Sequence, residues 1–343
     1  MMKASRSFLS TLAVLVVVSG CSAVAQQPVT PAVPVSQGPA DQQQTHKQDR
    51  PFELHALTPE FWELFDKNAT LTTMGTGFGF TEGPVWDPAG LLWVSDESKN
   101  RIDKLYKDGR VEHMVSLVDP DGSTYDPEHR LLSTASGLRA IIRLSADGKS
   151  FETVVDHYQG KKLNTPNDIV IGPDGAIYFT DPTIDMTHDQ QQELPPSVYR
   201  ISAGNSISLL TTDLKAPNGL AFSPDGKYLY IDDDDSMKIR RYKFHKGGTI
   251  SDGMDFADMT DPEKRGVPDG MKVDVKGRLF VSGPTGIWVW NLKGVHIGTV
   301  QMPRDMANLT WGGLDNSKLY ITASDTVYIL QTKTRGILGY IRK

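Results

Sequence analysis

Several features are scarce or missing in this sequence of 343 residues, and each absence narrows the alternatives. A single cysteine, Cys21, rules out a disulfide within the chain. The formal net charge is −6 and basic residues form no cluster, which argues against nucleic acid as a partner. After the first 20 residues no apolar run is long enough for a transmembrane helix. With 38% hydrophobic residues, the chain can still bury a large core.

Two common hydrolase signatures are also missing. No Gly-x-Ser-x-Gly segment occurs, so a serine esterase would have no visible nucleophile. The eight histidines form neither a His-x-His nor a His-x-x-x-His pair, which disfavours a zinc hydrolase of the usual kind.

The first 20 residues have the pattern of a secretory signal peptide. Lys3 and Arg6 precede an apolar run over residues 8–18, which is too short to span a bilayer and ends in small residues. The run closes with Val-Ser-Gly-Cys at residues 18–21. This motif resembles the bacterial lipobox, whose cysteine becomes the acylated first residue of a lipoprotein. The alternative is an ordinary signal peptide cut near Ala23 or Ala25.

Residues 21–50 are rich in Pro, Gln, Ala and Val without a period, which is typical of a flexible tether. We therefore expect an exported, periplasmic lipoprotein whose only contact with the membrane is the lipid on Cys21. The folded domain is then predicted to cover residues 51–343.

A turn followed by an alternating apolar strand recurs six times in that domain, at intervals of about 40 to 50 residues. Pro-Asp-Gly and related sequences supply the turn, and Leu, Tyr, Phe and Val supply the strand. Four strands fit in each interval, so the pattern predicts an all-β fold, a six-bladed β-propeller. The fourth residue of each copy is Gly90, His129, Gly175, Gly226, Gly277 or Ser317.

Oxygen-bearing side chains recur at a fixed distance from these turns. Eight positions before the turn residue, five of the six repeats carry Glu82, Asp121, Asn167, Asn218 or Asp269. The sixth repeat has Leu309 there, with Asn308 one position away. Any one of these Asp or Asn residues alone would most simply be a turn residue. Equal register in a radial fold instead brings them together at one end of the channel, where clustered carboxylates require a cation.

The segments that carry these residues resemble the gluconolactonase/regucalcin family (the senescence marker protein family), particularly its bacterial gluconolactonase branch. The similarity runs from about Leu71 to the C-terminus. It implies a six-bladed propeller that hydrolyses sugar lactones with one divalent cation, Ca²⁺ in the first place and Zn²⁺ or Mn²⁺ as alternatives. The matching segments are Phe-Thr-Glu-Gly-Pro-Val-Trp at 80–86, Leu-Asn-Thr-Pro-Asn-Asp-Ile-Val at 163–170, Tyr-Phe-Thr-Asp-Pro at 178–182, Ala-Pro-Asn-Gly-Leu-Ala-Phe-Ser-Pro-Asp at 216–225 and Val-Pro-Asp-Gly-Met-Lys-Val-Asp at 267–274.

The resemblance assigns roles position by position. Glu82 matches a carboxylate ligand of the cation, Asn218 an amide ligand, and Asp269 a second carboxylate ligand that is also the general base. Asn167 matches an amide that contacts the metal or the substrate. The nearby Asp168 is expected to have a structural role, as is Asp181.

One departure from the family concerns the substrate. Many bacterial members carry Cys-Glu-His-Gly where residues 134–137 read Thr-Ala-Ser-Gly, so Ser136 replaces a histidine. Asp121 stands where the family often has Asn. We therefore expect Asn167, Asp121 and Ser136 to contact the substrate, and lactonase chemistry in general is better supported than glucono-lactone specificity. The alternatives are a paraoxonase-like esterase on the same site, or a non-catalytic calcium-binding propeller that binds a carbohydrate or a protein. The sequence leaves the natural substrate and the oligomeric state undetermined.

Two further segments give weaker expectations. The run of aspartates at 232–235 lacks the spacing of a calcium loop, so it is expected to end a strand in solvent, with a second calcium site as the alternative. Residues 52–68 have helical spacing of apolar side chains, which predicts a short helix packed on the propeller.

Overall fold

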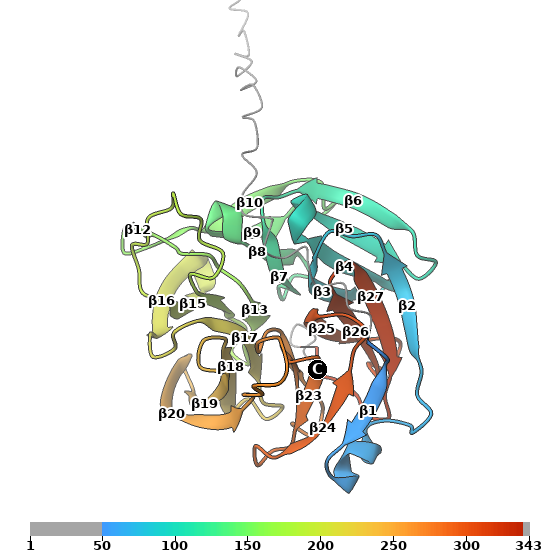
Figure 1. The fold of residues 1–343 in the computed structure, drawn as a ribbon. Coiled ribbons are helices and arrows are strands. Elements are labelled where there is room, and N and C mark those ends of the chain that lie inside the picture. The colour runs from blue at the N-terminus through green and yellow to red at the C-terminus, as the bar shows by residue number, and fades with distance from the viewer. Residues whose placement is uncertain (1–49, 339–343) are drawn as a thin grey trace, which may run out of the picture. The chain divides into compact units, whose positions relative to one another are not determined.

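A ring of six antiparallel sheets around a central channel forms the part of the chain that the structure, a computed structural model, describes, residues 50–338 (Figure 1). The predicted six-bladed all-β propeller is therefore confirmed. The predicted signal peptide (1–20), Cys21 and all but the last residue of the predicted tether lie outside the described residues. Within residues 50–338 no helix is both long and apolar enough to cross a membrane.

Each blade begins with its innermost strand, and the following strands lie successively further from the channel. The first blade contains β3 (Thr81–Asp87), β4 (Leu91–Asp96), β5 (Arg101–Tyr106) and β6 (Val111–Ser116), and the second contains β7 (Pro120–Tyr125), β8 (Leu131–Ala135), β9 (Ala140–Leu144) and β10 (Phe151–Val155). The third contains β13 (Ile169–Ile171), β14 (Ile177–Asp181), β15 (Ser197–Ser202) and β16 (Ser206–Thr211), and the fourth contains β17 (Pro217–Phe222), β18 (Tyr228–Asp233), β19 (Lys238–His245) and β20 (Thr249–Asp258).

The last two blades each take their outermost strand from the beginning of the domain. The fifth contains β21 (Met271–Val273), β22 (Leu279–Gly283), β23 (Gly286–Trp290), β24 (His296–Gln301) and β1 (Glu53–Ala56), and the sixth contains β25 (Met306–Gly312), β26 (Lys318–Ala323), β27 (Thr326–Gln331) and β2 (Leu71–Thr76). Outside the blades lie β11 (His157–Tyr158), β12 (Lys161–Lys162) and the 3₁₀ turns η1 (Pro59–Glu63), η2 (Glu97–Lys99), η3 (Ser136–Leu138) and η4 (Ala203–Asn205).

Strand β2 closes the ring because it pairs antiparallel with β27, with Thr72 opposite Ile329. Strand β1 pairs with β24 in the same way. The helix predicted for residues 52–68 is therefore wrong: the segment forms β1 and the short 3₁₀ turn η1. Its apolar residues face the fifth and sixth blades, since Phe61, Leu64 and Phe65 belong to the same buried cluster as Phe280.

The turns behave as their composition predicts. After β3 the side chain of Asp87 accepts a hydrogen bond from Ala89 N at 2.7 Å, and the Asp87 carbonyl accepts one from Gly90 N at 2.8 Å. Gly90 then takes the left-handed conformation, with φ 93°, that glycine adopts without strain. In the sixth blade the left-handed residue is Asn316 (φ 59°) and not Ser317. This displaced turn changes the register of that blade.

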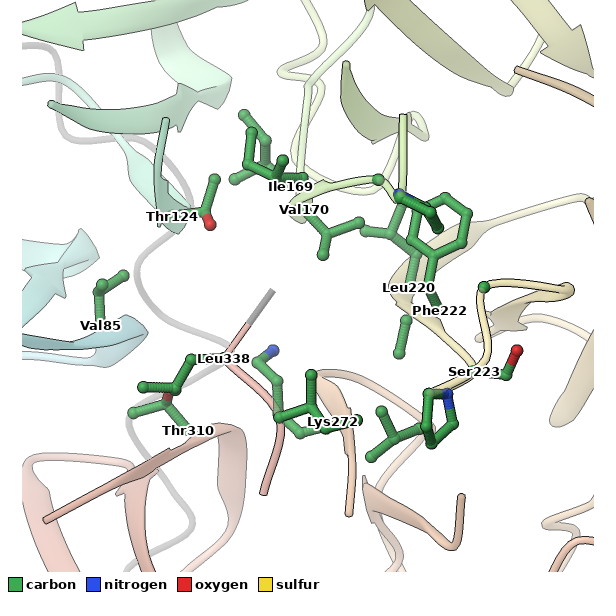
Figure 2. A pocket seen from close by; sticks show the side chains of 18 of the residues that line it. Val85, Thr124, Ile169, Val170, Leu220, Phe222, Ser223, Lys272, Thr310 and Leu338 are labelled. Carbon is green, nitrogen blue, oxygen red and sulfur yellow. The ribbon is translucent and has the colours of Figure 1, made fainter. Parts of the chain in front are cut away.

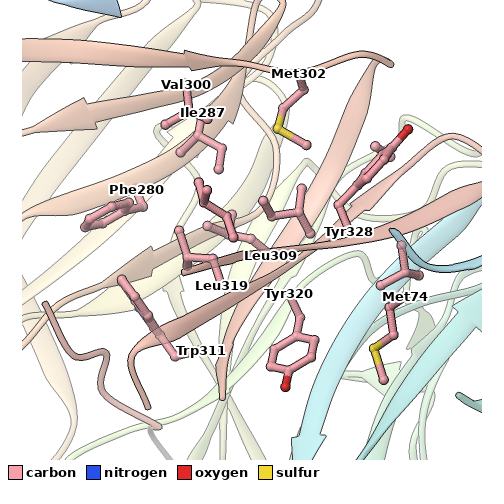
Figure 3. Close-up of a cluster of buried hydrophobic side chains, with 14 of the residues drawn as sticks. Met74, Phe280, Ile287, Val300, Met302, Leu309, Trp311, Leu319, Tyr320 and Tyr328 are labelled. Atoms are coloured by element: carbon pink, nitrogen blue, oxygen red, sulfur yellow. The ribbon is translucent and has the colours of Figure 1, made fainter. Parts of the chain in front are cut away.

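Aromatic and branched side chains between neighbouring blades make up the core. Trp86 of the first blade stacks on Tyr320 of the sixth with ring centroids 4.8 Å apart, and Phe280 of the fifth meets Trp311 of the sixth edge-on at 5.0 Å. Figure 3 shows this cluster between the fifth and sixth blades. Burying each such side chain contributes about 1.5–3 kcal/mol, so the blade contacts hold the channel in a fixed geometry.

Candidate functional site

Equivalent positions at the start of the inner strands define a ring of six residues at one end of the channel. In four blades a β-bulge lies at or just after this position, where the pairing of the first two strands shifts. The ring residues are Glu82, Asp121, Asn167, Asn218, Asp269 and Ala307. Five match the sequence prediction. The sixth is the buried Ala307 and not Leu309, because the left-handed turn residue of that blade is Asn316 and lies nine positions after the ring position.

Glycine directly after the ring position lets neighbouring blades approach closely. Gly83 has φ 46°, and a Cβ on it would collide with the carbonyl oxygen of Asp121 in the second blade. A Cβ on Gly219 would collide with the carbonyl oxygen of Asp269 in the fifth blade. The main chains that carry Glu82 and Asp121, and those that carry Asn218 and Asp269, are therefore in direct contact.

The two ring amides have fixed orientations. Asn167 Nδ2 donates to Asp121 Oδ2 at 2.6 Å, and Asn218 Nδ2 donates to Asp234 Oδ2 at 3.3 Å. Because both NH₂ groups are engaged, the amide oxygens are left to accept or to coordinate. Asn218 Oδ1 is buried and has no hydrogen-bond partner among the described residues. A buried acceptor in this state is completed by a ligand, an ion or an ordered water molecule.

Burial raises the pKa of each ring carboxyl group, and the charge of Glu82 adds to the rise for Asp121 and Asp269. Burial lifts the pKa of Glu82 to about 7, although hydrogen bonds to its Oε2 from Gly83 N (2.7 Å) and Asn308 Nδ2 (3.0 Å) oppose the rise. The pKa of Asp269 is well above its usual range because of burial and the negative charge of Glu82, and the same causes raise the pKa of Asp121. These side chains from three separate blades are thus close enough to interact electrostatically.

The donor set fits a hard divalent cation. Carboxylate and amide oxygens are the ligands that Ca²⁺ takes in proteins, and a cation would relieve the repulsion among the ring carboxylates. Among residues 50–338 no group of three or more His, Cys, Asp or Glu side chains is close enough to hold a metal ion. A cation site at the ring would therefore depend on the amide oxygens of Asn167 and Asn218 as well as on the carboxylates of Glu82 and Asp269.

The aspartates at the end of β18 support the ring and do not end the strand in solvent, so that expectation is wrong. Asp232 is fully buried, and its Oδ1 accepts a hydrogen bond from Gly219 N at 2.7 Å. Asp233 is also buried, and Asp234 holds the amide of Asn218. Only Asp235 of the run is exposed. The second strand of the blade lies directly against the inner strand, which brings its final residues to the ring.

Three carboxyl groups beside the ring were not singled out in the sequence: Glu97 on η2, Asp119 before β7, and Asp185 in the loop that follows β14. We call them the mouth carboxylates. Burial and mutual repulsion raise the pKa of Glu97 well above its usual range. Burial, followed by the charge of Asp119, raises the pKa of Asp185 to about 7, while contacts with Asn167 and Ser136 lower it. Asp185 Oδ2 is buried without a hydrogen-bond partner among the described residues.

Ser136 contacts both the mouth carboxylate Asp185 and the main chain next to the ring residue Asn167. It is buried, and its Oγ donates a hydrogen bond to the carbonyl oxygen of Pro166 at 2.8 Å, next to Asn167. The Ser136 hydroxyl therefore holds the main chain that carries Asn167, in addition to its contact with Asp185.

Asp181 has a structural position at the end of β14. Its Oδ2 accepts a hydrogen bond from Asn164 N at 3.0 Å, whereas Oδ1 is buried without a partner among the described residues. Burial raises the pKa of Asp181 to about 7, above the 3.8 of the unfolded chain. The folded state therefore binds this proton more tightly, and the stability that the neutral form contributes is lost as pH rises from about 4 through about 7.

We accordingly expect Asp181→Asn to stabilise the protein at pH 8, by the order of 1 kcal/mol or more, and to have little effect at pH 4. Thermal unfolding of both proteins across pH 4–8 measures the difference. Melting curves that stay parallel over this range would contradict the assignment.

The chain is similar to known lactone hydrolases over most of its length. The sequence model of the SMP-30/Gluconolactonase/LRE-like region matches residues 80–325. A gluconolactonase of Zymomonas mobilis is 29% identical over 311 residues, which span 83% of this chain and 87% of that protein. A pentonolactonase of Haloferax volcanii is 25% identical, over 71% of this chain and 81% of its own. The solved structure of a gluconolactonase from Xanthomonas campestris superposes with a TM-score of 0.75 at 31% identity, covering 83% of this chain and 98% of that one.

Proposed function

Because the chain belongs to the SMP-30/gluconolactonase/LRE-like family, we propose that it is a hydrolase that opens a sugar lactone at the ring of residues in the propeller channel. The observation that carries the placement of this site is the convergence of Glu82, Asn167, Asn218 and Asp269 from four blades, with a buried amide oxygen of Asn218 left without a partner. The lactonase activities of the relatives support the reaction class.

The proposed cofactor is one divalent cation, with Ca²⁺ ahead of Zn²⁺ or Mn²⁺ because all the donors are oxygen atoms. Glu82 and Asp269 would hold it through carboxylate oxygens, and Asn167 and Asn218 through amide oxygens. A cation bound there supplies electrophilic chemistry, since it polarises the lactone carbonyl and stabilises the negative charge that develops on its oxygen.

The chain's own carboxyl groups then move the proton. Asp269 accepts a proton from the water that attacks the carbonyl carbon. When the ester C–O bond within the lactone breaks, the same proton is returned to the leaving oxygen. The products are a hydroxyl group and a carboxylic acid on one open chain, so one lactone and one water are consumed.

The mouth carboxylates are proposed to bind the hydroxyl groups of the sugar. The Oδ2 atom of Asp185, which is buried without a hydrogen-bond partner among the described residues, gains a hydrogen bond when a hydroxyl reaches it. A site built this way discriminates against a lactone that lacks the hydroxyl.

We expect Asp185→Ala to raise KM for a polyhydroxylated lactone about tenfold while kcat changes less than about threefold, because binding and not proton transfer is affected. Steady-state kinetics on an aldonolactone and on an unsubstituted lactone of the same ring size measures this. Asp189→Ala, at an exposed position of the same loop, is the matched control. A fall in kcat with KM unchanged would contradict the role.

A panel of aldono-γ- and δ-lactones, an aryl ester and a phosphotriester tests the proposed function by pH-stat, with chelator and after addition of calcium. Hydrolysis of the aldonolactones, lost with chelator and restored by calcium, is the expected result. Faster turnover of the aryl ester or the phosphotriester would favour a paraoxonase-like esterase. Calcium binding without any hydrolysis would favour a non-catalytic binding propeller.

We also propose that the protein acts outside the cytoplasm, anchored through a lipid on Cys21. This proposal rests on the composition of residues 1–21 alone.

A further inference from the structure

One layer of residues below the ring contains a single charged side chain among the described residues. Three positions after each ring residue, the inner strand of each blade places one residue against a cavity of about 420 Å³. Of these six residues only Lys272, on β21, is charged (Figure 2). The six are Val85, Thr124, Val170, Ala221, Lys272 and Thr310.

The ammonium group of Lys272 is held by two residues from blades on either side of the channel. Its Nζ donates to Asn308 Oδ1 at 3.3 Å and lies 3.9 Å from Asp168 Oδ2. Asn308 and Asp168 directly follow the ring position in the sixth and third blades, where the other four blades have glycine. Both are buried, and Asp168 Oδ2 has no hydrogen-bond partner among the described residues. Lys272 is thus the counter-charge of this layer.

Asn308 connects Lys272 to the ring. Its Oδ1 faces the ammonium group and also accepts from Leu309 N at 2.9 Å, while its Nδ2 donates to Glu82 Oε2 at 3.0 Å. A Cβ on Gly270 would collide with the Asn308 amide, so the amide is packed tightly against the fifth blade. If the amide were reversed, its NH₂ would face the ammonium group and its oxygen would face the Glu82 carboxylate. Both contacts are repulsive, so Lys272 selects the orientation that supports Glu82.

We propose that Lys272 is a positioning residue for the cation site: it fixes the Asn308 amide, which in turn holds the Glu82 carboxylate in the orientation that binds the divalent cation. This inference rests on the proposed function, since it presupposes a cation on Glu82. It assigns Lys272 no contact with the cation or with the substrate.

The direction in which the cation affinity changes when Lys272 is replaced distinguishes a positioning role from a purely electrostatic one. Removing a positive charge near a cation site would, by Coulomb's law alone, tighten cation binding. Loss of positioning would weaken it, because Glu82 would lose its oriented donor. Methionine is a suitable replacement, since it keeps the length of the side chain and tolerates the largely apolar lining of the cavity.

The test is calorimetric titration of calcium into the chelator-treated, desalted protein, with thermal unfolding of each calcium-free variant as the check on folding. We expect Lys272→Met to raise the calcium Kd at least about tenfold, and Lys272→Arg, which keeps the charge and the donors, to stay within about threefold of wild type. Asn308→Leu should weaken binding about as much as Lys272→Met. The double variant should be no weaker than Asn308→Leu alone, because the lysine acts through the asparagine.

Thr310→Val is the matched control: it lies in the same layer of the cavity and should leave the calcium Kd unchanged. Unchanged or tighter binding by Lys272→Met would overturn the inference, as would additive losses in the double variant. Either result leaves the proposed function intact if the wild type binds calcium. A wild type that binds none would remove the cation from the proposed function and this inference with it.

Discussion

Asp269→Asn is expected to reduce lactone hydrolysis about 1000-fold. The substitution keeps the size of the side chain but removes both the general base and one negatively charged ligand. Asp269 is suited to the role because its side chain is partly exposed and is close enough to Glu82 to interact with it electrostatically. The rate is measured by pH-stat on the best aldonolactone at saturating calcium.

The control is Asp258→Asn, at the end of β20, where the side chain is exposed and contacts only the neighbouring turn. That variant should retain full activity. If Asp269→Asn kept more than about a tenth of the wild-type rate, Asp269 would not be the base, and the proton would have to go to another group at the channel mouth. The mouth carboxylates Glu97, Asp119 and Asp185 would then be the first candidates.

Glu82→Gln is expected to change stability in opposite directions with and without calcium. The folded-state pKa of Glu82, about 7, exceeds the 4.5 of the unfolded chain, so the stability that protonation contributes is lost as pH rises through about 7. At pH 8 without calcium, the neutral glutamine should therefore melt at a higher temperature than the wild type. With calcium at 1,000 Kd the order should reverse, because the wild type gains about 4.1 kcal/mol, which is more than the raised pKa of Glu82 costs it at pH 8.

For a domain of this size that gain corresponds to a rise in Tm of about 8–16 °C, and the variant should show less than about 1 °C. Differential scanning fluorimetry after dialysis against chelator measures both states. Glu128→Gln, on an exposed turn, is the control. A calcium-induced shift of equal size in Glu82→Gln and in the wild type would place the ion elsewhere.

Part of the site followed from local sequence because the repeat is local. Eight residues separate each predicted ring position from its turn, and the β-strand between them has little freedom to change its length. The identities of Glu82, Asp121, Asn167, Asn218 and Asp269 at the ring could therefore be predicted. Their roles as ligands, base and substrate contacts remain predictions.

The sixth blade shows where this reasoning fails. The turn motif places the turn residue at Ser317, but the left-handed residue is Asn316. It lies nine and not eight positions after the ring position, so the ring position is Ala307 and not Leu309. As a result Asn308 occupies a place where four blades have glycine, and its amide reaches both Glu82 and Lys272. No spacing rule relates Lys272 to Asn308, because these residues belong to different blades.

The sequence by itself determined the features that depend on about ten neighbouring residues, which are the six turns and the alternating strands. These features determine the number of blades and the identities of five residues at one end of the channel. Tertiary structure alone decided how the ring closes, with β2 completing the sixth blade, and which side chains meet across the channel. It buried Asp232 against the ring, brought Asp234 to the amide of Asn218, and placed Asp185 and Lys272 near the ring. The physical reason is that hydrogen bonding within a hairpin is local, whereas burial and charge at the channel depend on all six blades packing together.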